Sequence, residues 1–315
     1  MNLNCLSVSG PFTHENLGIF ILRGTDSFDG SRFIPLNEAL ERKCVIVHET
    51  GNVGQLEIEN LSDVLDLYVQ AGDVVKGGRQ DRTLGVDFVL PAKSGRVPVQ
   101  SFCVESGRWR SRAAEDVHSF SSSKSYLASK KLRMAAKMSK SQAEVWDKVA
   151  ETQEALGASI GASVLHAGSP TSYQLAVENE ALQKRKEAYA AALGKILDAA
   201  PDAVGYAFVI NGAINTADAY WSGVLFRKLW SKLLDAAILE AIAGVHQKPE
   251  TEPAPVTQAE IRVWFREADA GEISDRQEVP PRIRVETRRS AKSVLFDTCD
   301  HGFNDAVLHR NLVTQ

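Results

Sequence analysis

The sequence predicts an α+β fold: an N-terminal antiparallel β-sandwich or open barrel, then central helices, then C-terminal strands that rejoin the sheet. Changes in the hydrophobic pattern along the 315 residues support this prediction. Short β-rich segments fill residues 1–112, helical periodicity dominates residues 113–246, and strand patterns return in residues 258–315. Strands first, helices next and strands last are typical of α+β proteins with mainly antiparallel pairing.

The predicted strands of the N-terminal region are short and bounded by turn residues. Residues 18–22 (GIFIL) and 44–48 (CVIVH) are apolar, and residues 55–59 alternate as QLEIE. Further strand segments follow at 66–69, 85–90 and 97–104. Several short strands at this spacing are typical of a sandwich or an open barrel. A short helix is expected at residues 38–43.

Helical periodicity begins after residue 112. The first predicted helix covers about residues 124–140, with serines 121–123 as its N-cap and lysines opposite an apolar face. Further helices are predicted at residues 142–155, 177–200 and 225–242. The apolar segment 204–210 is predicted to be a buried strand that ends at the turn Asn211-Gly212.

The C-terminal region starts with a segment rich in proline and glutamate at residues 247–257, which predicts an exposed loop. Four strand segments are predicted beyond it, at 261–265, 282–286, 293–296 and 306–308. We expect one continuous domain, composed of the β-rich region (residues 1–112), the helical region (residues 113–246), the loop (residues 247–257) and the final strands (residues 258–315).

The composition is that of a globular protein, with 44% hydrophobic residues, 24% charged residues and a net charge of −4. Its four cysteines include no CxxC pair, which is typical of free thiols in a reducing compartment. The N-terminus lacks the pattern of a signal peptide, and the longest apolar stretch, near residues 236–245, contains Glu240. These features predict a cytoplasmic protein with no membrane-spanning segment.

The most informative motif is GDVVKGGRQDR at residues 72–82. Gly77 and Gly78 lack the Cβ that would keep a ligand or another segment away, and they can adopt positive φ. Lys76, Arg79 and Arg82 surround them with positive charge, and the arginine fork suits phosphate or carboxylate. The motif therefore predicts an anion-binding corner.

A structural interpretation of this motif stays open beside the functional one. In it, Asp81 and Arg82 form ion pairs with neighbouring loops, and the glycines only make a turn. Against it, Gln80 between charged residues is unusual for a plain surface turn, and could orient a ligand. The spacings GxxxxGK[ST] and GxGxxG are absent, so the motif is neither a P-loop nor a dinucleotide fingerprint.

A second motif, ESGRW at residues 105–109, follows one strand pair later. In a functional interpretation, Glu105 acts as a general base or binds a ribose hydroxyl, Arg108 joins the site of Arg82, and Trp109 stacks on a base. In the structural interpretation, Glu105 forms a buried ion pair with Arg108 or Arg82 beneath the tryptophan. Neither interpretation is excluded by the sequence.

Other constellations give weaker signals. Residues 101–140 contain nine Lys/Arg and three acids, but lysines along a helix opposite an apolar face usually form a solvated surface. In the predicted basic helix, residues 124–140, only Tyr126 could stack on a base, so nucleic acid is the less favoured partner. His48-Glu49 lacks a third ligand at readable spacing and GxSxG is absent, so neither a metal nor another cofactor is expected.

Taken together over about residues 35–315, these motifs resemble a bacterial family named for its association with ADP-ribosylglycohydrolases and rhodanese-phosphatases. The matching segments are VHE at 47–49, GGRQDR at 77–82, VESGRW at 104–109, Gln142 with Trp146, the strand 204–211, the helix 226–234 and VLH at 307–309. The resemblance implies binding or processing of NAD-derived nucleotides such as ADP-ribose. That role derives from neighbouring genes, and no catalytic residues are carried over.

The leading hypothesis is therefore an α+β protein that binds or processes an ADP-ribose-like anionic molecule. The candidate ligand-binding residues are Lys76, Gly77, Gly78, Arg79, Gln80, Asp81, Arg82, Arg108 and Trp109. Glu105 is the candidate acid/base, and His309 is added because it matches the family pattern. The alternative is a non-catalytic module for protein or nucleic-acid interaction, in which the Arg/Glu/Trp cluster is a structural lock. The sequence leaves the oligomeric state open.

Overall fold

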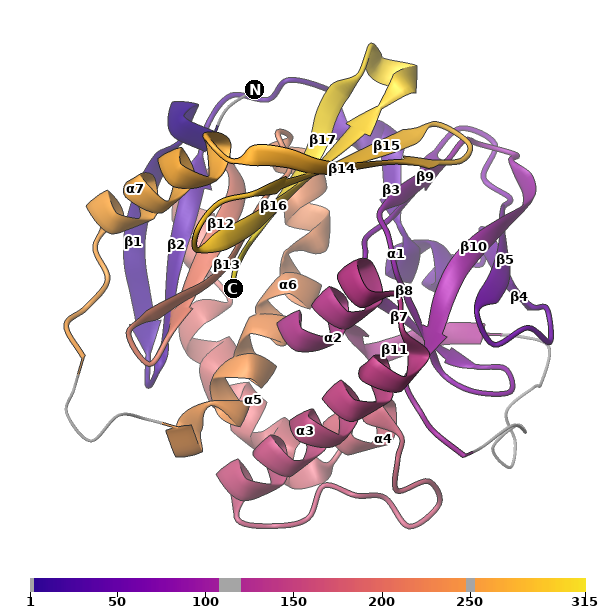
Figure 1. The fold of residues 1–315 in the computed structure, drawn as a ribbon, viewed down its shortest axis with the longest axis horizontal. Helices are drawn as coiled ribbons and strands as arrows, with labels where there is room; N and C mark the ends of the chain where they lie inside the picture. The colour runs from indigo at the N-terminus through magenta and orange to yellow at the C-terminus, as the bar shows by residue number, and fades with distance from the viewer. Residues whose placement is uncertain (1–2, 108–119, 248–252) are drawn as a thin grey trace. The chain divides into compact units, whose positions relative to one another are not determined.

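A computed structural model describes residues 3–107, 120–247 and 253–315 of the chain. The chain divides into two compact units (Figure 1). Unit 1 comprises Met1–Ser31 and Ala188–Gln315, and unit 2 comprises Arg32–Glu187. Unit 2 is thus inserted into the chain of unit 1 after its first strands, and each unit is described separately below.

Unit 1 is built on an eight-stranded antiparallel sheet with the order β1-β2-β12-β13-β17-β16-β15-β14. Its strands are β1 (Ser7–His14), β2 (Leu17–Arg23), β12 (Ala203–Ile210), β13 (Ala213–Ala219), β14 (Glu272–Val279), β15 (Ile283–Arg289), β16 (Ser293–Asp300) and β17 (Ala306–Thr314). The C-terminal strands join the sheet that β1 and β2 begin, as the sequence predicted. The predicted strand 204–210 is confirmed as β12, with the turn Asn211-Gly212 after it.

The helices of unit 1 pack on this sheet. They are α6 (Gly223–Ala243), α7 (Gln258–Asp269), and the 3-10 turns η1 (Leu3–Cys5), η4 (Ile196–Ala199), η5 (Val245–Gln247) and η6 (His301–Phe303). The predicted helix 225–242 is confirmed as α6, which begins after Ser222, whose hydroxyl accepts the Leu225 N–H. This cap satisfies a backbone donor that the first helical turn leaves unpaired.

The strand predicted at residues 261–265 is wrong, because these residues lie in helix α7. A capping box formed by Thr257 and Glu260 starts the helix. Ile261, Trp264 and Phe265 then fall on one buried face at the helical spacing i, i+3, i+4, and they join the core cluster of the sheet. The β-rich composition of IRVWF concealed this period.

Unit 2 contains a six-stranded antiparallel sheet, β11-β7-β8-β10-β5-β4, and a three-stranded sheet, β3-β6-β9. Its strands are β3 (Phe33–Pro35), β4 (Val45–Glu49), β5 (Gln55–Asn60), β6 (Asp66–Val69), β7 (Asp73–Gly77), β8 (Arg82–Leu84), β9 (Phe88–Leu90), β10 (Gly95–Cys103) and β11 (Phe120–Leu127). The end strands β11 and β4 lie close together, so the larger sheet is nearly closed and the predicted open barrel is confirmed.

The helices of unit 2 follow the barrel strands, apart from α1. They are α1 (Leu36–Glu41), α2 (Lys130–Met134), the π-helical turn η3 (Ala135–Ser139), α3 (Gln142–Ile160), α4 (Tyr173–Val177) and α5 (Glu180–Leu193), which runs across the boundary into unit 1. The turn η2 (Gly30–Arg32) lies at the other boundary. The helix predicted from residue 142 is confirmed as α3. The single helix predicted for residues 177–200 is instead α5 followed by the short turn η4.

The basic helix predicted for residues 124–140 is wrong. Residues 120–127 form strand β11, which pairs with β7, and helix α2 starts only after the N-cap Ser129. The backbone groups of β7 supply hydrogen-bond partners that outweigh the weak helix preference of a serine-rich segment. The lysines of this stretch therefore do not form one helical stripe, and Lys131 pairs with Glu151 on α3 at 3.3 Å.

Candidate functional site

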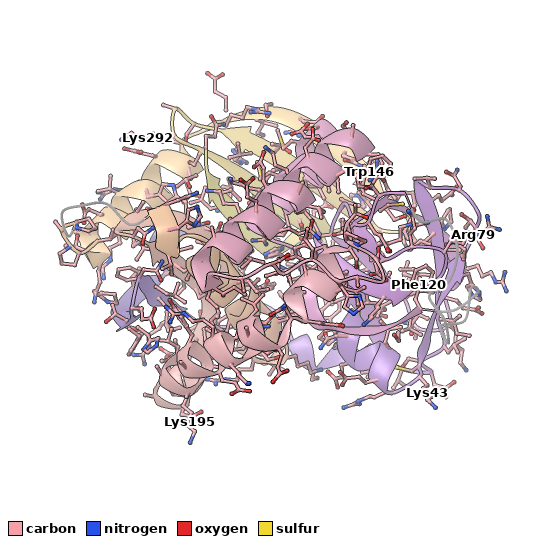
Figure 2. All side chains as sticks on the ribbon, turned by 90° about the horizontal axis from the view of Figure 1, so that it is seen from below. Lys43, Arg79, Phe120, Trp146, Lys195 and Lys292 are labelled. Atoms are coloured by element: carbon pink, nitrogen blue, oxygen red, sulfur yellow. The ribbon has the colours of Figure 1, made fainter. Side chains whose placement is uncertain are left out.

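The double glycine of the GGRQDR motif forms the turn between β7 and β8. Gly77 has φ +129° and Gly78 has φ +58°, a region that favours glycine. A Cβ on Gly78 would lie 2.3 Å from Cζ of Phe120 on β11. The close approach predicted at this glycine is therefore made by the ring of Phe120, which Figure 2 labels on unit 2 together with Arg79.

Glu49, the last residue of β4, neutralises this turn from one side. Its Oε2 accepts the backbone N–H of Arg79 at 3.2 Å and lies 3.4 Å from Nη2 of Arg82. The Glu49 side chain is 3% exposed and that of Arg82 is 0% exposed, so this ion pair is buried. Nη1 of Arg82 also donates to the carbonyl oxygen of Gln80 at 2.9 Å. The Arg82 guanidinium is thus held by internal acceptors.

The sequence reasoning did not select Glu49 as a site residue. The available signal was its position at the end of the strand in the family pattern, at residues 47–49. Asp81, by contrast, was selected as a ligand-binding residue and is buried. Its carboxylate accepts the N–H of Gly77 at 3.0 Å and the hydroxyl of Ser172 at 3.4 Å. The carboxylates of Asp81 and Glu49 therefore accept the backbone N–H groups of Gly77 and Arg79 in this turn.

Glu105 lies two residues beyond the end of β10 and is completely buried. Its carboxylate accepts a hydrogen bond from the hydroxyl of Ser169. Its backbone carbonyl accepts the side-chain amide of Gln80 at 3.0 Å and the indole N–H of Trp146 at 3.2 Å. Glu105 is thus contacted by Gln80 of the GGRQDR motif, by Trp146 on helix α3 and by Ser169 in the segment before α4.

Gln142 completes this arrangement at the start of α3. Its amide donates to the carbonyl of Cys103 and accepts the N–H of Cys103, both at 2.8 Å, as a neighbouring strand would. On the other side, the N–H of Tyr173 donates to the carbonyl of Val104 at 3.0 Å. We refer to Gln80, Glu105, Gln142, Trp146 and Ser169 as the Glu105 cluster. The cluster holds residues 103–105 in place, and the described segment ends two residues later, at Gly107.

Two candidate ligand-binding residues, Arg108 and Trp109, lie outside the described residues. Gly107 before them is exposed and has φ +76°. Arg79 is half-buried, and Figure 2 shows it at the margin of unit 2. Lys76 is also half-buried, and its Nζ lies 2.9 and 2.7 Å from the two carboxylate oxygens of Glu178. Among the described cationic candidates, Lys76 and Arg79 are thus more accessible than Arg82.

A hollow of about 300 Å³ lies beside the Lys76–Glu178 pair in unit 2. It is lined by Val164, Leu165, His166, Leu175, Glu178, Asn179 and Glu180. Sequence reasoning selected none of these residues, because they combine into a hollow only when the segment before α4 folds back toward the start of α5. A volume of this size is at the lower end of small-molecule sites.

His309 lies in unit 1, whereas Glu105 lies in unit 2. His309 is 1% exposed on β17, and its Nε2 lies 2.9 Å from Oδ1 of Asp218. Asn311 donates to the same oxygen at 2.8 Å, and the imidazole stacks on Tyr220 with ring centroids 4.4 Å apart. This is the arrangement of a hydrogen-bonded core histidine. The catalytic role of His309 stays a prediction from the family pattern.

A second histidine in unit 1 leads to a pH prediction. Hydrogen bonds to the carboxylates of Glu278, which has the larger effect, and of Asp305 raise the pKa of His301 above its ordinary value. A raised pKa in the folded state contributes stability below the ordinary pKa, and this contribution is lost as the pH rises through the raised pKa. We expect an NMR titration of His301 to show a higher midpoint in the folded than in the urea-unfolded protein. Glu278→Gln should lower that midpoint, and an unchanged midpoint would contradict the assignment.

Within residues 3–107, 120–247 and 253–315, no three His, Cys, Asp or Glu side chains are grouped as metal ligands. The described helices include none with the length and apolar character needed to span a bilayer. In unit 2, the motifs that contain Gln80, Glu105 and Gln142 with Trp146 meet at the Glu105 cluster.

The chain matches the family model of the ARG and Rhodanese-Phosphatase-superfamily-associated Protein domain over residues 5–313. It belongs to this family, and the resemblance noted in the sequence is confirmed. The family name links the domain to systems that contain ADP-ribosylglycohydrolases. Comparison with curated proteins and with solved structures gave no match.

Proposed function

We propose that this protein binds or processes an NAD-derived nucleotide such as ADP-ribose, and that unit 2 holds the site. The observation that carries the proposal is the convergence of the family motifs on the Glu105 cluster. Gln80, Glu105, Gln142 and Trp146 come from three separate stretches of the sequence, yet their hydrogen bonds fix one backbone segment, at residues 103–105. A scaffold of this kind places a neighbouring loop accurately, as a binding site requires.

In this proposal the buried and the accessible motif residues have different tasks. The Glu49–Arg82 pair and Gln80 hold the turn and the end of β10 in place. Arg79, which is half-buried, contacts the phosphates. Arg108 and Trp109 come three and four residues after Glu105 in the sequence, and we assign them the second phosphate contact and the stacking on a base.

The role of Glu105 depends on Ser169. A carboxylate that acts as general acid or base must lie within hydrogen-bond reach of the reacting group. Ser169 occupies an oxygen of Glu105 and is itself buried. Because Glu105 is completely buried, catalysis by its carboxylate requires that the segment carrying Ser169 moves and admits the reacting group, whereas simple binding requires no such movement.

Isothermal titration calorimetry with ADP-ribose and NAD tests the proposal. We expect the wild-type protein to bind ADP-ribose, and Arg79→Ala to weaken binding about tenfold, because charge-assisted hydrogen bonds to phosphate are lost. Arg96→Ala is the matched control, since Arg96 is 60% exposed on β10 and pairs only loosely with Glu57 and Glu59, at 3.9 Å. Absence of heat at millimolar ADP-ribose and NAD would exclude the proposed function.

The burial of the charged motif residues favours a second candidate function, a non-catalytic interaction module. Arg82 and Glu105 are both 0% exposed, as expected for a structural lock. In that case the wild-type protein binds neither ADP-ribose nor NAD, and replacing Arg82 or Glu105 lowers stability alone. The calorimetry described above therefore distinguishes the two functions.

A further inference from the structure

The hollow beside the Lys76–Glu178 pair combines apolar walls with a few polar groups. Val164 is buried, Leu175 is half-buried and Leu165 is 53% exposed, so an apolar surface is available at its rim. His166 is exposed, and its Nδ1 accepts the N–H of Gly168 at 3.0 Å. A neutral imidazole with this hydrogen bond carries its proton on Nε2, which is a donor.

The two carboxylates of the hollow are each paired with a lysine. Glu178 is held by Lys76 at 2.7 Å, and Glu180 lies 2.8 Å from Lys184, one helical turn further along α5. Their charges are therefore largely compensated, so a cationic ligand gains little there. A phosphate gains little as well, because both lysines are already paired with these carboxylates. A neutral ligand with hydroxyl groups and an apolar face fits these walls best.

The Glu178 carboxylate can bind such a ligand without releasing Lys76. An ionised carboxylate offers about four lone-pair positions, and Lys76 approaches the two oxygens of Glu178 at 2.9 and 2.7 Å. The side chain of Glu178 is 19% exposed, so the remaining acceptor positions are partly desolvated. A hydroxyl bound there forms a charge-assisted hydrogen bond.

We propose that this hollow binds the nucleoside end of the ligand, a base with its ribose, and that Glu178 accepts a hydrogen bond from a ribose hydroxyl. The base packs against Leu165 and Leu175, so in this arrangement Trp109 is not its stacking partner. The proposal rests on the proposed function for the phosphates, which leave the hollow toward Lys76 and the Gly-Gly turn. Lys76 connects the hollow to the Gly-Gly turn, because it pairs with Glu178 in the hollow and immediately precedes Gly77 in the sequence.

Adenosine and 2′,3′-dideoxyadenosine separate the contributions of the base and of the ribose hydroxyls. We expect calorimetry to show that adenosine binds the wild-type chain, competes with ADP-ribose and binds about tenfold more tightly than the dideoxy analogue. Glu178→Met keeps the side-chain length but removes both acceptor oxygens, so the tenfold difference should disappear. Glu187→Gln, an exposed change on α5 outside the hollow, is the matched control and should behave as wild type.

Leu165→Trp provides a second variant that does not disturb the Lys76–Glu178 pair. A half-exposed leucine tolerates this change, and the larger ring fills the hollow, so adenosine and dideoxyadenosine should both bind at least tenfold more weakly. Unchanged adenosine affinity in this variant would overturn the hollow as the subsite. Equal binding of the two nucleosides by the wild-type chain would overturn the role of Glu178.

The outcomes also separate this inference from the proposed function. If ADP-ribose binds and adenosine does not, the nucleoside subsite is wrong and the proposed function stands. If adenosine binds and ADP-ribose does not, the hollow is supported and the proposed function fails. If neither ligand binds at millimolar concentration, both are wrong.

Discussion

Replacing Arg82 with methionine is expected to lower the free energy of unfolding by about 3–5 kcal/mol. The reason is that the change leaves the carboxylate of Glu49, 3% exposed, without its buried cationic partner. The carbonyl of Gln80 also loses the donor Nη1 of Arg82. Urea denaturation followed by circular dichroism measures this loss directly.

Two further variants make this prediction specific. Arg79→Met should change stability by less than about 1 kcal/mol, because the Arg79 side chain is half-buried and Glu49 holds its backbone N–H. The double variant Glu49→Gln with Arg82→Met should recover part of the lost stability, since residue 49 then carries no buried charge that needs a partner. A loss below about 1 kcal/mol for Arg82→Met alone would show that the pair is not a structural lock.

Replacing His309 with alanine is expected to lower the free energy of unfolding by about 3 kcal/mol. The imidazole is 1% exposed, so its removal leaves a cavity against Tyr220. It also removes one hydrogen-bond partner of the buried carboxylate of Asp218. The same denaturation experiment measures this effect.

A surface histidine of the same unit is the control for His309. His246 is exposed in η5, and His246→Ala should change stability by no more than about 0.5 kcal/mol. Binding of ADP-ribose should be measured on His309→Ala at a temperature where the variant is folded. If that variant retains wild-type stability but loses binding, His309 acts at the ligand and the structural account of its position is wrong.

The elements that the sequence predicted correctly carry a clear local pattern. The helices that begin at Gln142 and Gly223 show apolar residues at helical spacing after a serine N-cap, and the strand 203–210 is uniformly apolar. Two segments that were assigned the wrong type of secondary structure lack such a pattern. Residues 120–127 are rich in serine and become a strand by pairing with β7, whereas residues 261–265 look β-like but form the buried face of α7.

The candidate site was predictable only to a limited extent. Its two central motifs could be found, because glycine and arginine in an unusual arrangement are visible in the chain itself. Their partners could not be chosen: Glu49 pairs with Arg82 from 33 positions away, and Ser169 binds Glu105 from 64 positions away. Many carboxylates and hydroxyls lie at such distances along the chain, and only the fold selects one of them.

The sequence by itself determined the α+β class, the family and the position of the Gly-Gly turn, because hydrophobic periodicity, glycine spacing and short motifs are local properties of a chain. The tertiary structure alone decided that β2 pairs with β12, that Phe120 covers Gly78, and that Arg82 is sealed while Arg79 is not. Burial and ion pairing depend on which distant segments meet, and that is set by the packing of the whole core.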